Sequence, residues 1–247
     1  MTQASRLRSV VPAPLREPAR TLLRWYRRRL SPSRLNLGDL ARTTPIDASW
    51  GAGRGRPIDR MYIERFLERH QADIRGRVLE VKDDKYVRRY GHDLEQIDVL
   101  DIDPANSRAT VVADLQDPSR LPEGAFDCVV LTQVLQFVYD VPAALQGVRR
   151  MLAGGGILLA TVPGITRVSP HERERATEWW RFTALSARRL AEEAFGAGNV
   201  DVETFGNVLA AAGMLYGLAA EDLSPRDLAA SDVSYEVAIG IRAVKRS

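Results

Sequence analysis

The sequence predicts an α/β domain built on a mostly parallel sheet with helices on both faces. Strand-length apolar runs rich in β-branched residues alternate with longer segments that carry apolar residues at helical spacing. Alternation of this kind is typical of a parallel sheet with crossover helices. The last two strand-like runs can pair as a hairpin, which makes the last of seven strands antiparallel.

The predicted elements follow one another in a regular order. A helix begins near Pro57 and carries Ile58, Met61, Tyr62 and Phe66 on one face. The predicted strands cover residues 78–81, 97–102, 110–113, 126–131, 157–163, 199–205 and 235–244. The later helices are expected over residues 141–152, 171–195 and 208–218. Three glycines, 154–156, are expected to close the helix over 141–152 with a left-handed C-cap.

Length and charge indicate one domain with a basic leader. The chain has 247 residues, of which 45% are hydrophobic, enough for one α/β core. Residues 1–60 hold 13 Lys and Arg against 4 Asp and Glu. We therefore expect a leader over residues 1–56, with one basic amphipathic helix at 15–30 and an irregular connector, and a domain over 57–247. The leader helix can lie on anionic lipid, pack on its own domain, or form a partly disordered arm.

Composition also bounds the compartment and the partners. Cys128 is the single cysteine, so the chain forms no internal disulfide, and a reducing cytoplasm is expected. The sequence has no run of 18 apolar residues and no signal peptide. No cluster has convincing metal-ligand spacing, so we assign no metal site, and a divalent ion is left as an unsupported alternative. Because the basic excess belongs to the leader, we expect no nucleic-acid partner.

The stretch from Arg77 to Asp103 indicates a nucleotide site, although its loop is unusual. Two short strands are each followed or ended by an acid, and such a carboxylate can accept the ribose hydroxyl protons at the carboxyl edge of a sheet. A nucleotide loop normally carries glycines, which let the backbone approach the ligand. The corresponding positions here are Lys82, Asp84 and Tyr86. The alternative is an ordinary buried strand followed by a solvated turn.

Longer motifs resemble one family. The segment FDCVVLTQVLQFVYDVPAALQGVRRMLAGGGILLATVP, with the order of the strands, resembles the class I S-adenosylmethionine-dependent methyltransferases of the type 11 kind, whose fold is Rossmann-like. GRPIDRMYIERFL and WRFTALSARRL are similar to motifs of a subgroup associated with sugar and polysaccharide biosynthesis. The resemblance covers roughly residues 57 to 245. It implies S-adenosylmethionine as the cofactor.

The resemblance also implies roles for individual residues. Glu80 matches the acid that holds the ligand's ammonium group, Asp101 the ribose position, and Asp114 the position that bonds the adenine amine. Leu115 would pack on the adenine ring. Thr132 and Gln133 lie at the lip of the fourth strand, where methyl donor and acceptor meet. The remaining predicted cofactor-binding residues are neighbours of these positions, namely Val81, Lys82 and Ile102.

Lys82 is the clearest departure from the family pattern. Its ammonium group can pair with the carboxylate of the ligand in a charge-assisted contact. Alternatively, the cation repels the sulfonium and crowds the pocket.

The acceptor side of the site is predicted with less support from motifs. His171 is the candidate general base, because an imidazole titrates near neutrality; a surface histidine beside Glu172 is the alternative. The predicted substrate-binding residues could stack on a sugar or hydrogen-bond to it; they are Arg60, Tyr62, Trp179 and Arg181. For the tryptophans, a position in the core is the alternative.

Three functions are consistent with the sequence. The favoured one is methylation of a hydroxyl on a glycan or a glycosylated metabolite. The second is a protein of the same fold that methylates nothing and serves as a partner or structural subunit of a biosynthetic complex. The third, a nicotinamide oxidoreductase, fits the terminal strand pair poorly.

Overall fold

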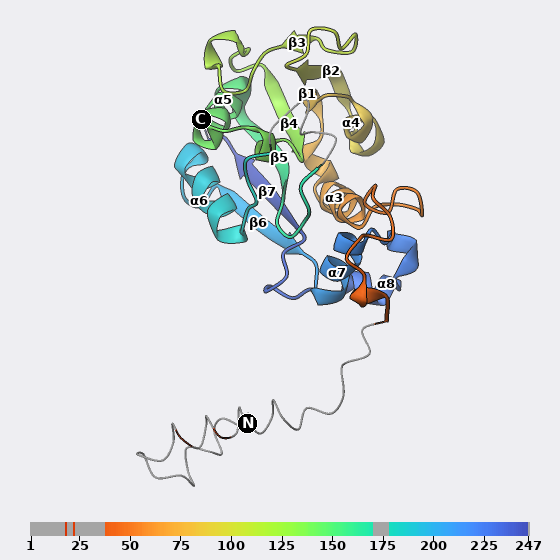
Figure 1. Cartoon of the computed structure of the whole chain (residues 1–247). Coiled ribbons are helices and arrows are strands. Elements are labelled where there is room, and N and C mark those ends of the chain that lie inside the picture. The colour runs from red at the N-terminus through yellow and green to blue at the C-terminus, as the bar shows by residue number, and fades with distance from the viewer. Residues whose placement is uncertain (1–17, 19–21, 23–37, 170–177, 247) are drawn as a thin grey trace. The chain divides into compact units, whose positions relative to one another are not determined.

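The computed structural model describes residues 18, 22, 38–169 and 178–246, and the chain forms two compact units, Met1–Thr43 and Thr44–Ser247 (Figure 1). In the first unit the described part includes a short 3-10 helix, η2 (Gly38–Ala41). The predicted leader helix lies almost wholly outside the described residues. The predicted boundary between residues 56 and 57 falls inside the second unit.

Within the described residues, the second unit is organised around one seven-stranded sheet with the order β3-β2-β1-β4-β5-β7-β6. The first five strands in the chain are parallel where they pair, and β7 is antiparallel to both β5 and β6. This confirms the predicted seven-stranded sheet with an antiparallel last strand. The strands are β1 (Gly76–Val81), β2 (Leu94–Asp101), β3 (Val111–Val112), β4 (Phe126–Thr132), β5 (Leu152–Pro163), β6 (Val200–Phe205) and β7 (Ala238–Val244).

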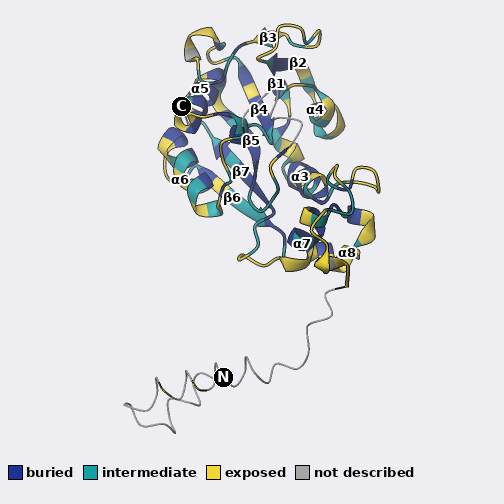
Figure 2. Cartoon of the chain, in the orientation of Figure 1, coloured by how far each residue is buried: buried dark blue, intermediate teal, exposed yellow. Residues whose placement is uncertain are grey.

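Helices cover both faces of this sheet. Alternate residues of each strand enter different cores: Val78 lies with the apolar side chains of α3 and α7, and Leu79 lies with those of α5 and α6. Both side chains are fully buried, and Figure 2 shows the sheet as the mainly buried layer. The helices are α3 (Ile58–Arg69), α4 (Lys85–Tyr90), α5 (Val141–Met151), α6 (Ala184–Phe195), α7 (Val208–Tyr216) and α8 (Pro225–Ala229).

The segment 44–56 packs within the second unit. Arg54 makes two hydrogen bonds of 2.9 and 2.7 Å to the carboxylate of Asp222 in η7 (Ala220–Asp222). Gly51 has a φ of +85°, and a Cβ at this position would lie 2.5 Å from the carbonyl oxygen of Leu218. Glycine is therefore required where this segment crosses the end of α7.

Two predictions about local structure are wrong. The helix predicted over 171–195 begins only at Ala184, because Thr183 caps it and accepts a hydrogen bond from the Ser186 N–H at 3.2 Å. Residues 178–183 are not helical, and 170–177 lie outside the described residues. The glycines 154–156 do not cap a helix: α5 ends at Met151, and these residues lie in β5, where its register with β4 shifts.

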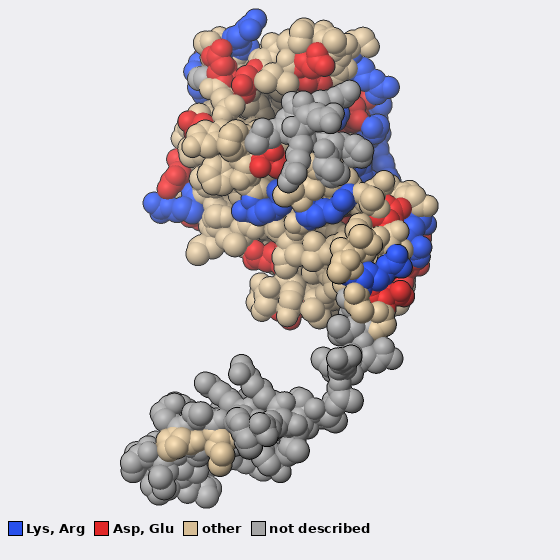
Figure 3. Space-filling view, in the orientation of Figure 1, with Lys and Arg blue, Asp and Glu red and all other residues tan. Residues whose placement is uncertain are grey.

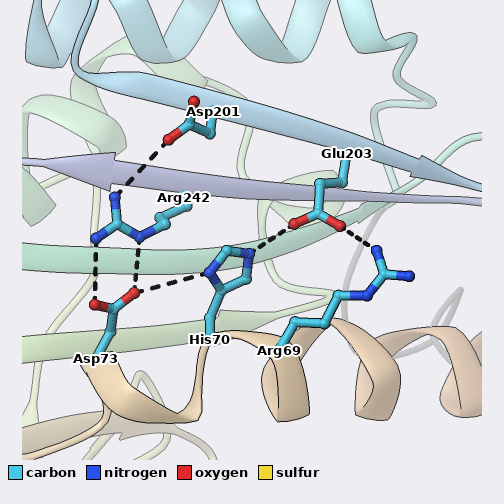
Figure 4. Close-up of polar contacts among 6 residues, drawn as sticks. All are labelled: Arg69, His70, Asp73, Asp201, Glu203 and Arg242. Carbon is cyan, nitrogen blue, oxygen red and sulfur yellow. Dashed lines mark hydrogen bonds and ion pairs between the residues drawn. The ribbon is translucent and has the colours of Figure 1, made fainter.

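A network of charged side chains joins the end of α3 to the edge of the sheet (Figure 4). Arg242 of β7 donates to Asp73 at 2.7 and 3.2 Å, and Asp73 lies in η3 (Gln71–Asp73). His70 Nε2 lies 2.7 Å from Glu203 of β6, which also accepts a hydrogen bond from Arg69 at 2.7 Å. The network ties the helix that follows the leader segment to the two terminal strands.

Candidate functional site

The candidate site lies at the carboxyl edge of the parallel strands. Glu80 is near the end of β1, Asp101 ends β2 and Thr132 ends β4. Because β1 pairs with both β2 and β4 in parallel, these ends meet at one edge. A cavity of about 470 Å³ lies at the opposite, amino-terminal edge, near Gly76 and Asp127, and is not part of this site.

Glu80 is buried, and its carboxylate is already engaged by the chain. One oxygen accepts a hydrogen bond from the Tyr86 N–H at 3.2 Å, and the other accepts one from the Val87 N–H at 2.9 Å. Burial raises the pKa of this carboxyl to about 7, against the lowering effect of both hydrogen bonds. Glu80 therefore binds the backbone of the first turn of α4 to the end of β1.

Lys82 occupies a backbone conformation that normally belongs to glycine. Its φ is +74°, its N–H donates to the Leu100 carbonyl at 2.8 Å, and its own carbonyl accepts from Asn106 Nδ2 at 2.9 Å. Among the described residues, the Lys82 ammonium group forms no ion pair, whereas the neighbouring Asp83 and Asp84 pair with Lys85 and Arg88. Lys82 therefore keeps the turn of a glycine loop and adds to it a cation that has no ion-pair partner within the described part of the chain.

Asp101 and Ile102 offer the features that a ribose and an aromatic base require. Asp101 accepts from Asn106 Nδ2 at 2.7 Å and from the Asp103 N–H at 3.0 Å, which leaves about half of its lone pairs for a ligand. Ile102 is 66% exposed, an apolar surface beside an acid at a strand end. Sequence reasoning missed Asn106, which joins Asp101 to the Lys82 backbone; its position within an Asp-Pro-Ala-Asn turn was the available signal.

Asp114 and Leu115 follow β3. Asp114 accepts a hydrogen bond from the Gln116 N–H at 2.9 Å, and the Gln116 side chain accepts one from the Asp140 N–H at 2.9 Å. Leu115 is only 4% exposed and lies in the core on the α5 side. Ile102, rather than Leu115, thus presents the apolar side chain that a ring could cover. Val81 also packs against this core and is half-buried.

Polar side chains lie close together at the carboxyl end of β4, here called the lip of β4 (Thr132 and Gln133). Thr132 pairs in register with Thr161 of β5, and Gln133, with a φ of +56°, follows directly. Gln136 Nε2 lies 3.3 Å from Gln133 Oε1. Two buried atoms at this lip, Gln136 Oε1 and Thr161 Oγ1, have no hydrogen-bond partner in the described part of the chain. Such groups normally bind a water or a ligand.

The predicted substrate-binding residues do not gather in one place. Tyr62 is 1% exposed, stacks on Phe205 and donates its hydroxyl to the Leu228 carbonyl, so it belongs to the core. Arg60 lies on α3 and reaches the Tyr86 hydroxyl at 3.3 Å.

Trp179 and Arg181 lie near the lip of β4, on the segment before α6. Arg181 is bound to the Trp180 and Arg167 carbonyls and to Glu178, at 2.8, 2.9 and 2.9 Å, so its donors are largely used within the chain. Trp179 is half exposed. His171, the predicted base, falls outside the described residues.

Comparison with known proteins supports a methyltransferase domain. Residues 49–160 match the family model described as "Methyltransferase domain". A search of curated proteins finds no match. The chain has the class I methyltransferase fold. S-adenosylmethionine is the cofactor that accompanies this domain and fold.

Three solved structures illustrate the fold. A SAM-dependent methyltransferase from Archaeoglobus fulgidus shares 13% identity and a TM-score of 0.50, over 75% of this chain and 94% of that one. A second, from Mesorhizobium loti, shares 15% identity and a TM-score of 0.50, over 72% and 95%. The [4+2]-cyclase SpnF shares 16% identity and a TM-score of 0.51, over 78% and 85%. The same fold therefore occurs in proteins with different reactions.

The residues of this chain fit S-adenosylmethionine unevenly. The adenosine half fits, because Asp101 has unused acceptor capacity and Ile102 presents apolar surface beside it. The amino-acid half fits in a modified form, because Glu80 is engaged by α4, and Lys82, which forms no ion pair among the described residues, adds a positive charge to the loop. A cation at this position suits the carboxylate of the cofactor.

Other ligand classes gain no support. Among the residues that the structure describes, no helix is long and apolar enough to cross a membrane. None of the described His, Cys, Asp and Glu residues form a group suited to a metal ion. On the face drawn in Figure 3, Lys and Arg residues lie along the upper right edge and in patches across the middle, with acids elsewhere on the same face.

Proposed function

We propose that this protein is an S-adenosylmethionine-dependent methyltransferase that methylates a hydroxyl of a sugar on a glycan or a glycosylated metabolite. The observation that carries the reaction type is the convergence of Glu80, Asp101 and Thr132 at one edge of a methyltransferase sheet. The sugar acceptor rests on the similarity of GRPIDRMYIERFL and WRFTALSARRL to motifs of a subgroup associated with sugar and polysaccharide biosynthesis.

Each group at this edge has a proposed task. The bound cofactor supplies a methyl group activated by a sulfonium, so the protein mainly has to align the acceptor and remove one proton. Asp101 accepts the ribose hydroxyls, Ile102 covers the adenine and Asp114 bonds its amine. Lys82 pairs with the carboxylate. His171 is the proposed base.

Labelled S-adenosylmethionine provides the test of this proposal. We expect the purified protein to bind the cofactor and to transfer label to a glycoside acceptor. Transfer that is lost in Asp101→Ala but retained in Asp103→Ala would tie the reaction to this site. Failure to bind either S-adenosylmethionine or S-adenosylhomocysteine contradicts the proposal.

A second candidate is a protein of this fold that methylates nothing and acts within a biosynthetic complex. The engagement of Glu80 with α4 and the side chain at Lys82 favour this candidate, because both alter the loop that holds the amino-acid part of the cofactor. Cofactor binding without transfer to any glycoside, together with co-purification of a partner enzyme, would support it over the first.

The basic leader is proposed to add a peripheral contact with anionic membranes. Its excess of Arg over acids favours an anionic surface. Flotation of the full chain with anionic and neutral vesicles tests this contact, and a chain lacking residues 1–43 is the control. Equal flotation of the two chains contradicts it.

A further inference from the structure

Three exposed aromatic side chains form a cluster beside the lip of β4. Tyr139, Trp179 and Trp180 are 62%, 50% and 41% exposed. The rings of Tyr139 and Trp179 lie 4.8 Å apart at 70°, and those of Tyr139 and Trp180 lie 6.1 Å apart at 32°. These residues come from two segments, one before α5 and one before α6. A concentration of three large rings at a surface indicates a binding site.

The cluster is fixed without a ligand. The indole N–H of Trp180 donates to the carbonyls of Val138 and Tyr139, at 3.0 and 3.2 Å. The backbone N–H of Trp179 donates to the Gln136 carbonyl at 2.8 Å. Because these bonds hold both segments together, the rings lose little freedom when a ligand binds, which favours affinity.

A polar group lies next to the cluster. Gln136 follows the lip of β4 and is only 4% exposed, and its Oε1 has no partner within the described part of the chain. Its backbone carbonyl binds Trp179, and its side chain binds Gln133. The cluster therefore adjoins Thr132 and Gln133, where the proposed methyl transfer takes place.

The charges around the cluster disfavour a cationic ligand. Arg181 and Arg167 lie on the segments that flank it, and Arg181 neutralises Glu178 at 2.9 Å. A second neighbouring acid, Asp140, caps α5 by accepting from the Ala143 N–H at 3.0 Å. Both of these described carboxylates are thus engaged within the chain rather than directed at a cation.

We propose that Tyr139, Trp179 and Trp180, here called the aromatic corner, bind a pyranose ring of the acceptor. The 70° angle between Tyr139 and Trp179 forms a corner rather than a parallel slot, and a corner suits a puckered ring with C–H groups on both sides better than a flat aromatic ring. The polar edge of the sugar would face Gln133 and Gln136. This inference rests on the proposed function and transfers acceptor recognition from Tyr62 and Arg60 to the aromatic corner.

Saturation-transfer NMR with a panel of methyl glycopyranosides tests the aromatic corner directly. Phenol and tetramethylammonium serve as planar and cationic probes. The variants are Tyr139→Ala and Trp179→Ala, with Tyr139→Phe as the ring-retaining control and Leu185→Ala as a control on a side chain that is 78% exposed nearby on α6. Calorimetry with S-adenosylhomocysteine accompanies every variant, and near-UV circular dichroism checks the fold.

We expect at least one pyranoside to bind, with affinity at least about fivefold weaker in Tyr139→Ala and Trp179→Ala and unchanged in both controls. Affinity for S-adenosylhomocysteine should stay constant throughout. Pyranosides that bind Trp179→Ala as well as the wild type, tighter binding of phenol or tetramethylammonium, or no pyranoside binding in a protein that binds S-adenosylhomocysteine would each overturn the aromatic corner. A wild type that binds pyranosides as expected but no S-adenosylhomocysteine instead overturns the proposed function alone.

Discussion

The carboxylate of Glu80 accepts a hydrogen bond from the Val87 N–H at 2.9 Å, and this bond joins the end of β1 to α4. In a glycine loop, the backbone itself shapes the turn between the first strand and the next helix. Here a buried acid and the left-handed Lys82 shape that turn. The arrangement retains the path of the chain while it changes which charges a cofactor meets.

Glu80 gives stability a specific dependence on pH. Burial raises its pKa from the ordinary 4.5 to about 7. The pKa of Glu80 is therefore higher in the folded state than in the unfolded state. Its contribution to stability is fully present at a pH below the pKa of the unfolded state, and it is lost as the pH rises through the pKa of the folded state. We expect the free energy of unfolding to fall by on the order of 2–3 kcal/mol between about pH 4.5 and 7, relative to Glu80→Gln. Urea unfolding of both proteins across this range measures the difference. Parallel pH profiles would contradict it.

Asp101→Ala should weaken cofactor binding strongly. Loss of the charged acceptor of the ribose hydroxyls costs about 1.5–3 kcal/mol for each bond, so affinity for S-adenosylhomocysteine should fall at least tenfold. Asp114→Ala should have a smaller effect, because the adenine also gains from apolar packing. Calorimetry measures both. The control is Asp103→Ala, which removes a carboxylate that accepts from the Ala105 N–H at 2.9 Å. Unchanged affinity in a folded Asp101→Ala protein removes Asp101 from the site.

The sequence predicts the fold more completely than the site. The strand Phe126–Thr132 is readable because its residues 128–131 form a continuous apolar run that is buried on both faces of a parallel sheet. The predicted start of α6 is wrong for two reasons. Thr183 caps the helix, and the backbone N–H of Trp179 donates to the Gln136 carbonyl instead of to a carbonyl of a helix. The sequence places Tyr62 on the apolar face of its helix and also makes it a substrate-binding candidate, and only the packing against Phe205 decides between these two roles.

Site residues are harder to predict because the residues that they contact come from distant segments of the chain. Glu80 could be placed at a strand end, but its bonds to the α4 backbone depend on the course of the loop. Asn106 binds Asp101 only because the turn after β2 folds back. Tyr139 meets Trp179 across 40 residues of sequence, and no local pattern predicts that contact.

Arg242→Met should destabilise the fold through Asp73. The pair is largely buried, with side chains that are 24% and 18% exposed. Loss of the guanidinium leaves the carboxylate with an unsatisfied charge, which costs about 1–3 kcal/mol. Arg189→Met is the matched control, because its bridge to Glu193 is exposed and contributes less than about 1 kcal/mol. Chemical unfolding of both variants measures the costs, and equal effects would contradict the role of the network in Figure 4.

Two N-terminal deletions should differ in melting temperature. Removal of residues 1–43 leaves the second compact unit entire, so its melting temperature should stay close to that of the full chain. Removal of residues 1–56 also deletes the Arg54–Asp222 pair and the packing of Gly51 on Leu218. We expect the longer deletion to melt at least several degrees lower. Scanning calorimetry compares them; a large loss in the shorter deletion would show that the leader supports the domain.

Lys82 decides between an altered cofactor site and an obstructed one. If its ammonium group pairs with the ligand carboxylate, Lys82→Gly and Lys82→Met should both bind S-adenosylhomocysteine about tenfold more weakly, since a charged hydrogen bond contributes roughly 1.5–3 kcal/mol. Stability should rise by about 0.5–1 kcal/mol in Lys82→Gly only, because glycine relieves the strain of the left-handed conformation.

Methylthioadenosine, which lacks the amino-acid group, isolates the pairing of Lys82. Its affinity should be equal in the wild type, Lys82→Gly and Lys82→Met, because the adenosine half of the site stays intact. Calorimetry with both ligands yields the contribution of the carboxylate by difference. Lys82→Gly binding S-adenosylhomocysteine more tightly than the wild type would show that the side chain obstructs the pocket. That result would favour the non-methylating function, because the cation would then oppose the sulfonium of the methyl donor.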